Sequence, residues 1–299
     1  MSAASSCLVA IRPGGSRPPL FCGHPAGGNV LCFVALAREL GPEQPFYGLQ
    51  SPGLEGDQEP YTRIEEMAIH YLKQLRALEP RGPYRLAVWS FGGLVAYEMA
   101  QQLRAAGEEV ALLALLDTGV PGAGADPDAA TFEDDAPWLA DVGEFIARLA
   151  GEESPVSCDE LKDLAPEGRI EFFVERMRES DLLPPGTSAS QVRSLLRVYK
   201  ANVRAAGHYS PRPYPGPIAL FRAGGDPGAA AESAKDPTLG WSALSPMPVE
   251  VHTVPGDHVT LLAEPNVAVL AERLRECLDR ARDRIVLGAP ASSRLVGEA

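Results

Sequence analysis

The stretch YRLAVWSFGGLVAYEMA, residues 84–100, constrains the fold of this chain more than any other part of the sequence. A short apolar run ends at Trp89, and a helical apolar pattern begins at Gly92 and Gly93. The chain must therefore reverse within a few residues, which predicts a strand, a tight turn at Ser90 and a helix. Such a turn holds the serine in a strained backbone conformation with its Oγ exposed, as in a nucleophile elbow.

The residues around the serine fit this interpretation with one exception. Gly92 and Gly93 leave no side chain that would collide with the strand or block the start of the helix. The N-terminus of that helix carries free N–H groups, which suit a developing oxyanion. Val88 departs from the G-x-S-x-G pattern, which has glycine two residues before the serine. We expect Gly23 and Ala87 to leave space for this β-branched side chain, with a slightly altered elbow.

Short apolar runs alternate with helical patterns along much of the chain, which is typical of a mostly parallel sheet flanked by helices. The expected strands cover residues 20–23, 45–50, 84–89, 110–117, 217–222 and 249–254. The expected helices cover residues 30–40, 64–78, 93–106 and 266–281. The sequence therefore predicts an α/β fold.

This alternation breaks between residues 121 and 212. A small, acidic, proline-rich segment leads into three amphipathic patterns, and Ser188 or Ser190 is expected to cap the third. We interpret residues 121–212 as a helical lid insertion into a core of residues 8–120 and 213–283, with 284–299 as a disordered tail. The alternative is an added structural subdomain. The substrate-binding residues stay unassigned, because aromatic stripes in helices are usually ordinary packing.

Composition limits the function classes. The chain has 299 residues, 45% of them hydrophobic, and a net charge of -13, which argues against a nucleic-acid partner. Its five cysteines are scattered and fit neither a disulfide framework nor a zinc site. No apolar run is long enough for a signal peptide or a membrane span. We expect a soluble cytoplasmic protein with no metal and no membrane partner.

A serine hydroxyl is a poor nucleophile until a base takes its proton. His258 directly follows the last predicted strand, at the carboxyl edge of the sheet where the serine also lies. We therefore expect His258 to be the base. His252, inside that strand, is interpreted as structural. His24 is interpreted as a loop or core histidine without a catalytic role, because no acidic neighbour is evident.

The base needs a carboxylate to hold its tautomer, and two aspartates end strands at the correct edge. Asp117 closes the strand after the elbow, and Asp226 follows the next strand along the chain. Spacing alone cannot separate these two, whereas Asp257 is expected to point elsewhere. An oxyanion hole needs two backbone donors. We expect them to be the N–H of Phe91, directly after the nucleophile, and that of Ala26, in an early glycine-containing loop.

Several stretches together carry a resemblance to a known family. They are RPPLFCGHPAGG, PFYGLQSPGL, GPYRLAVWSFGGLVAYEMAQQL, LLALLDT, PYPGPIALFRAG, GWSAL and VPGDHVTLL. From about Leu8 to Ala281 the chain resembles the chain-releasing thioesterase domains that end nonribosomal peptide and polyketide synthases. This resemblance implies an α/β-hydrolase fold with a helical lid.

The resemblance also implies the site roles. It selects Asp117 as the acid, since in this family the acid follows the strand after the elbow, and leaves Asp226 as the runner-up. It makes Ser90 the acyl acceptor and His258 the base. The N–H groups of Ala26 and Phe91 then form the oxyanion hole.

The implied activity is that of a serine thioesterase. It would release a polyketide or peptidyl chain from the phosphopantetheine of a carrier protein through an acyl-serine, by hydrolysis or macrocyclisation. The partner is then an acyl or peptidyl carrier protein, and no cofactor is bound. The alternatives are a stand-alone editing thioesterase, a carboxylester hydrolase and a non-catalytic binding protein of the same fold.

Overall fold

The computed structural model describes residues 7–56, 58–121, 133–225 and 236–287. Among these residues, seven strands form one sheet in the order β1-β3-β2-β4-β5-β6-β7. Only the pairing of β1 with β3 is antiparallel. The strands are β1 (Leu8–Arg12), β2 (Leu20–Gly23), β3 (Phe46–Leu49), β4 (Tyr84–Trp89), β5 (Val110–Leu116), β6 (Ala219–Ala223) and β7 (Glu250–Val254). The predicted mostly parallel sheet is confirmed.

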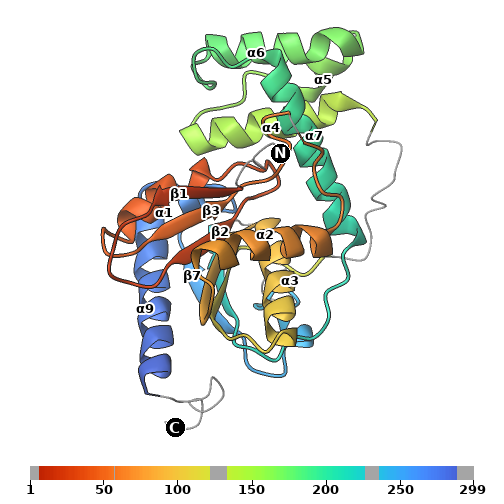
Figure 1. The fold of residues 1–299 in the computed structure, drawn as a ribbon. Helices are drawn as coiled ribbons and strands as arrows, with labels where there is room; N and C mark the ends of the chain where they lie inside the picture. The colour runs from red at the N-terminus through yellow and green to blue at the C-terminus, as the bar shows by residue number, and fades with distance from the viewer. Residues whose placement is uncertain (1–6, 57, 122–132, 226–235, 288–299) are drawn as a thin grey trace.

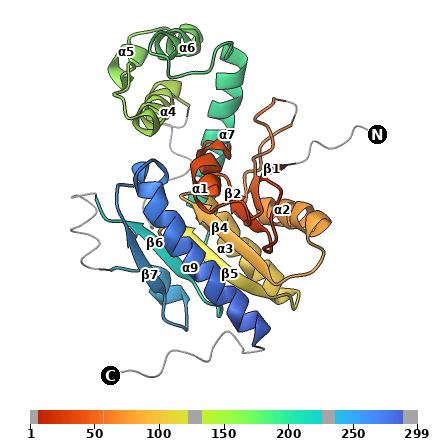
Figure 2. The same cartoon turned by 90° about the vertical axis from the view of Figure 1, so that its left-hand side faces the viewer.

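Helices cover both faces of this sheet (Figures 1 and 2). One face packs against α1 (Val34–Glu39) and α9 (Asn266–Val286), and the other against α2 (Ile64–Leu78) and α3 (Gly92–Ala105). Alternate side chains of β4 belong to different layers, because successive residues of a strand point to opposite faces. Leu86 and Val88 lie on the α2 and α3 side, whereas Ala87 and Trp89 lie on the α1 and α9 side.

The structure differs from the prediction at both ends of the chain. The first strand, β1, was not predicted, because its short apolar run ends in Arg12 and lacks a following helix. Helix α9 continues to Val286, past the predicted core boundary at residue 283. There Arg284 donates to the Ala111 carbonyl (3.1 Å). The helical residues 284–286 are therefore not part of a tail, and residues 288–299 lie outside the described residues.

Among the described residues, four helices lie between β5 and β6. They are α4 (Asp135–Ala150), α5 (Cys158–Lys162), α6 (Arg169–Glu179) and α7 (Ala189–His208). Three of them and the start of the fourth lie beyond one end of the sheet, and the fourth runs down to the core (Figures 1 and 2), where Ala205 joins the α2 and α3 layer. The four helices share a hydrophobic core of their own, in which Leu139, Phe173 and Leu196 are buried. Ser188, one of the two predicted caps, accepts from the Gln191 N–H at the start of α7. The short α5 was not predicted.

Short 3-10 turns join these elements: η1 (Leu31–Phe33), η3 (Pro166–Gly168), η4 (Trp241–Leu244) and η5 (Thr260–Leu262). In the described part of the chain, every helix is too short or too polar to cross a membrane.

Glycines make room for the turn between β4 and α3. A Cβ at Gly92 would lie 2.7 Å from the carbonyl oxygen of Gly23. One at Gly93 would lie 2.3 Å from Oγ1 of Thr118. Real Cβ atoms do not approach other atoms this closely, so α3 can start directly against β2 and the end of β5 only with glycine at both positions.

Gly23 also leaves the space that Val88 needs. A Cβ at Gly23 would lie 3.3 Å from Cγ1 of Val88, which is tighter than an ordinary contact. Ala87 faces the opposite side of the sheet, so the expectation that it makes room for Val88 is wrong. A valine under the elbow is therefore accommodated by one glycine on the neighbouring strand.

We predict that Gly23→Ala lowers the free energy of unfolding by about 1 kcal/mol or more, because its new Cβ presses on Val88. In a Val88→Ala background that methyl contact is gone, so the two substitutions are expected to couple by about 0.5 kcal/mol or more. Urea unfolding of the four chains measures this cycle. Gly168→Ala, whose Cβ would meet nothing within 4 Å, is the control. Additive effects of the two substitutions would contradict the packing.

Candidate functional site

Ser90 occupies a left-handed backbone conformation between β4 and α3, with φ of 56°. Its N–H donates to the Leu116 carbonyl (3.1 Å), at the end of β5. Its own carbonyl accepts from Oγ1 of Thr118 (2.9 Å). Non-glycine residues rarely adopt this conformation, and here two hydrogen bonds to the next strand hold it. The predicted strained turn is present.

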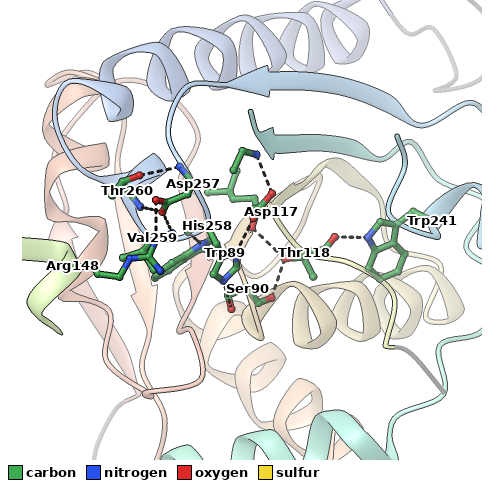
Figure 3. A network of polar contacts seen from close by, with 12 residues as sticks. Trp89, Ser90, Asp117, Thr118, Arg148, Trp241, Asp257, His258, Val259 and Thr260 are labelled. Carbon is green, nitrogen blue, oxygen red and sulfur yellow. Dashed lines mark hydrogen bonds and ion pairs between the residues drawn. The ribbon is translucent and has the colours of Figure 1, made fainter. Parts of the chain in front are cut away.

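The side chains of Ser90, His258 and Asp117 form one line of hydrogen bonds (Figure 3). The Ser90 Oγ lies 3.0 Å from His258 Nε2, and His258 Nδ1 lies 2.8 Å from Asp117 Oδ2. The His258 side chain is 43% exposed, so a reactant can reach it, whereas that of Asp117 is 17% exposed. The structure therefore brings together the three side chains that the sequence singled out.

Asp117 follows β5 directly and also has a left-handed backbone, with φ of 46°. Its second oxygen, Oδ1, accepts from the Ala223 N–H (2.9 Å) on β6. Burial acts to raise the pKa of Asp117, but the hydrogen bonds from His258 and Ala223 outweigh it and leave the pKa below its ordinary value. A carboxylate only accepts, so His258 carries its proton on Nδ1 and has Nε2 free to take the serine proton.

The loop that carries His258 is held from two sides (Figure 3). On one side, the indole N–H of Trp89 donates to the His258 carbonyl (2.9 Å). On the other, the Asp257 carboxylate accepts from the N–H groups of Val259 and Thr260, both at 3.0 Å. Asp257 thus points away from the imidazole, as expected. These contacts fix the position of the ring relative to the elbow.

The two predicted oxyanion donors, Ala26 and Phe91, lie on segments that contact each other. Phe91 is the N-cap residue of α3, and Ala26 lies in the turn that the Gly28 N–H closes on the Pro25 carbonyl (2.9 Å). The rings of His24 and Phe91 stack with centroids 5.8 Å apart, so the two segments are neighbours. Among the described residues, neither the Ala26 nor the Phe91 N–H donates to another protein group.

The helices between β5 and β6 contact the core beside these residues. Phe145 of α4 stacks on Trp89, with ring centroids 5.7 Å apart. Arg148 of α4 pairs with Asp257 (2.7 Å), next to His258. Asn202 of α7 donates to the Ala26 carbonyl (2.8 Å). Trp89 and Asp257 directly precede Ser90 and His258 in the chain, and Ala26 is a predicted oxyanion donor. The helices therefore contact the site or the residues next to it.

His252, on β7, lies in a separate cluster. Its ring stacks on Phe221 (4.8 Å), and its Nε2 lies 3.0 Å from Glu250 and 3.4 Å from Cys277. Arg280 donates both to Glu250 and to Cys277, so a guanidinium already supplies the positive charge there. The interpretation of His252 as structural agrees with these contacts.

Thr118 and Trp241 support the elbow and were missed from the sequence. The indole N–H of Trp241 donates to the Thr118 carbonyl (2.7 Å), while Thr118 Oγ1 donates to the Ser90 carbonyl. The sequence signal for Thr118 was a hydroxyl side chain directly after Asp117, at the end of the predicted strand. Trp241 lies in GWSAL, one of the stretches that carry the resemblance, but its contact with Thr118 spans 123 residues and has no local signature.

The family model for the thioesterase domain matches residues 18–277. The chain belongs to the thioesterase domain family. This thioesterase domain is 36% identical over 220 residues to a dimodular nonribosomal peptide synthase of Bacillus subtilis, covering 73% of this chain and 9% of that protein. It is 30% identical over 278 residues to chondramide synthase of Chondromyces crocatus, covering 92% of this chain and 7% of that protein.

Solved structures similar to this chain support its assignment to the family. The four-domain nonribosomal peptide synthetase holo-AB3403 matches with a TM-score of 0.81 and 31% identity, over 91% of this chain and 20% of that one. The NocB thioesterase domain from the nocardicin cluster matches with a TM-score of 0.63 and 25% identity, over 91% and 98%. The predicted resemblance is confirmed. This thioesterase domain spans less than a tenth of the two synthases compared above.

We predict that Asp117→Asn lowers kcat for thioester cleavage by about 10³-fold or more. The Ala223 N–H would hold the amide oxygen, so the amide NH₂ would face His258 Nδ1. The ring would then carry its proton on Nε2 and could not accept one from Ser90. Steady-state kinetics with a soluble acyl thioester measure the effect.

Asp226→Asn is the matched control, because Asp226 was the runner-up from sequence and lies outside the described residues. Its kcat is expected to stay within about threefold of that of the unmodified chain, whereas Asp117→Asn should lose about 10³-fold or more. The opposite ranking of the two variants would show that the wrong acid has been assigned.

Proposed function

We propose that this chain is a serine thioesterase that releases a peptidyl or polyketide chain from the phosphopantetheine of a carrier protein through an acyl-Ser90 intermediate. The observation that carries the proposal is the 3.0 Å contact between Ser90 Oγ and His258 Nε2, with His258 bonded in turn to Asp117. Membership of the thioesterase family and similarity to two nonribosomal peptide synthases support it.

In the first half-reaction, Ser90 Oγ attacks the thioester carbonyl carbon while its proton moves to His258 Nε2. Asp117 stabilises the resulting imidazolium through Nδ1. The negative oxygen of the tetrahedral intermediate lies between the N–H groups of Ala26 and Phe91. When the carbon–sulfur bond breaks, His258 returns the proton to the departing thiol. An acyl ester on Ser90 remains.

The second half-reaction repeats these steps with a different nucleophile. His258 takes a proton from water, which gives a free acid, or from a hydroxyl or amine of the acyl chain itself, which gives a ring. We infer that α4 and α7 act as a lid that limits the access of water, and their contacts with Trp89, Asp257 and Ala26 support this role. The phosphopantetheine arm comes with the carrier protein as part of the substrate.

The proposed partner and setting follow from this chemistry. A carrier protein has to present its acyl arm at the carboxyl edge of the sheet, where Ser90 and His258 lie. The five cysteines, all within the described residues, form no disulfide, which fits a reducing cytoplasm.

We predict that incubation with an acyl-N-acetylcysteamine thioester adds one acyl group to the intact mass, located on Ser90. Ser90→Ala is expected to lack the adduct and to lose more than about 10³-fold in turnover, since no other hydroxyl is activated by His258. Intact and peptide mass spectrometry provide the measurement. An adduct of equal yield in Ser90→Ala would contradict the proposal.

Two further measurements on the same reaction define its class. Faster turnover of nitrophenyl esters than of thioesters of the same acyl group would favour a carboxylester hydrolase instead. In ¹⁸O-labelled water, a hydrolysed product carries the label, whereas a cyclised product does not.

A further inference from the structure

The orientation of the Ala26 N–H depends on the peptide unit that contains it. A trans peptide is planar, so its N–H and C=O groups point in opposite directions. The C=O of this unit belongs to Pro25, and it accepts two hydrogen bonds, from the Gly28 N–H (2.9 Å) and from His24 Nδ1 (2.8 Å). Whatever holds the Pro25 carbonyl therefore aims the Ala26 N–H.

The hydrogen bonds of His24 determine its tautomer. A carbonyl oxygen only accepts, so Nδ1 carries the proton in its bond to Pro25. The other nitrogen, Nε2, lies 2.7 Å from the hydroxyl of Tyr71, which donates to it. His24 is 1% exposed, and burial lowers its pKa to about 4 against the opposing effect of the Pro25 carbonyl. The ring is therefore neutral, with each nitrogen in a single role.

The same ring also contacts the segment that carries the second donor. His24 stacks on Phe91 with ring centroids 5.8 Å apart and an angle of 24° between the planes. The edge of Tyr71 packs against His24 at 5.7 Å. One buried imidazole thus bonds the Pro25 carbonyl, which belongs to the peptide unit of the Ala26 N–H, and stacks on Phe91.

We propose that His24 is a positioning residue for the oxyanion hole, acting through the Pro25 carbonyl on the N–H of Ala26. The inference rests on the proposed function. Two donors on one carbonyl also polarise its peptide group, which makes the Ala26 N–H a stronger donor. His24 is therefore expected to stabilise the tetrahedral intermediate and to leave the affinity for the thioester unchanged.

The next peptide unit of the loop is held in the same way. Asn202 of α7 is fully buried, and its Nδ2 donates to the Ala26 carbonyl (2.8 Å). The peptide units before and after the Cα of Ala26 are thus both held through their carbonyls. His24 bonds the Pro25 carbonyl, and Asn202 bonds the Ala26 carbonyl.

Two amide substitutions separate the roles of the ring nitrogens. In His24→Asn, the amide NH₂ lies where Nδ1 was and can still donate to Pro25, but the contact with Tyr71 is lost. In His24→Gln, the longer side chain places its amide near Nε2, where it meets Tyr71 and leaves Pro25 with one donor. Tyr71→Phe is the matched control for the buried cluster, because it keeps the bond between His24 and Pro25.

We predict that His24→Gln lowers kcat by about 10- to 100-fold, less than the 10²–10³-fold loss of an oxyanion donor, with KM unchanged. His24→Asn and Tyr71→Phe are expected to stay within about fivefold of the unmodified chain on the same basis. Affinity for a boronic acid, which forms a tetrahedral adduct on Ser90, should fall in parallel with kcat/KM. Titration of Ser90 with a fluorophosphonate corrects every rate for the active fraction.

Equal kcat per titrated site in His24→Gln and His24→Asn would overturn the inference, as would a change in KM alone. In the unmodified chain, ¹⁵N spectra should show His24 with its proton on Nδ1. A proton on Nε2 would overturn the inference without any variant. If Ser90→Ala stays active, the proposed function fails. If Ser90→Ala is inactive while His24→Gln is fully active, only the role of His24 fails.

Discussion

The left-handed turn at Ser90 is the constraint on which the site depends. Its backbone is held by the Leu116 carbonyl and by Oγ1 of Thr118, both from the end of the neighbouring strand. Without these bonds a serine with φ of 56° would relax, and its Oγ would move away from His258. Gly92 and Gly93 let α3 begin directly at the turn. The strain is therefore supported by backbone packing and by hydrogen bonds to the next strand.

The parallel sheet explains why distant residues meet at this turn. In parallel strands the carboxyl ends lie at one edge, so Ser90 after β4, Asp117 after β5 and His258 after β7 converge there. The inserted helices α4 and α7 reach the same edge and touch Trp89, Asp257 and Ala26. A movement of these helices would therefore change contacts to Trp89 and Asp257, the chain neighbours of Ser90 and His258, and to Ala26.

Much of the site could be read from local sequence, because strand ends and glycine turns are local features. The choice between Asp117 and Asp226 could not, since it depends on a backbone φ and on a hydrogen bond from Ala223 across to the next strand. The anchoring of the His258 loop by Trp89 was missed for the same reason, as the two are far apart in sequence. The edge strand β1 was missed because a short antiparallel strand lacks the strand–helix alternation that marked the others.

In the proposed reaction, His258 takes the proton of Ser90 during attack on the thioester. Rapid-quench measurement of thiol release in the first turnover tests it most directly, with His258→Ala compared against the unmodified chain at equal folded concentration. The first-turnover rate constant of His258→Ala is expected to fall by about 10³-fold or more. A burst of thiol release at an unchanged rate in His258→Ala would contradict it.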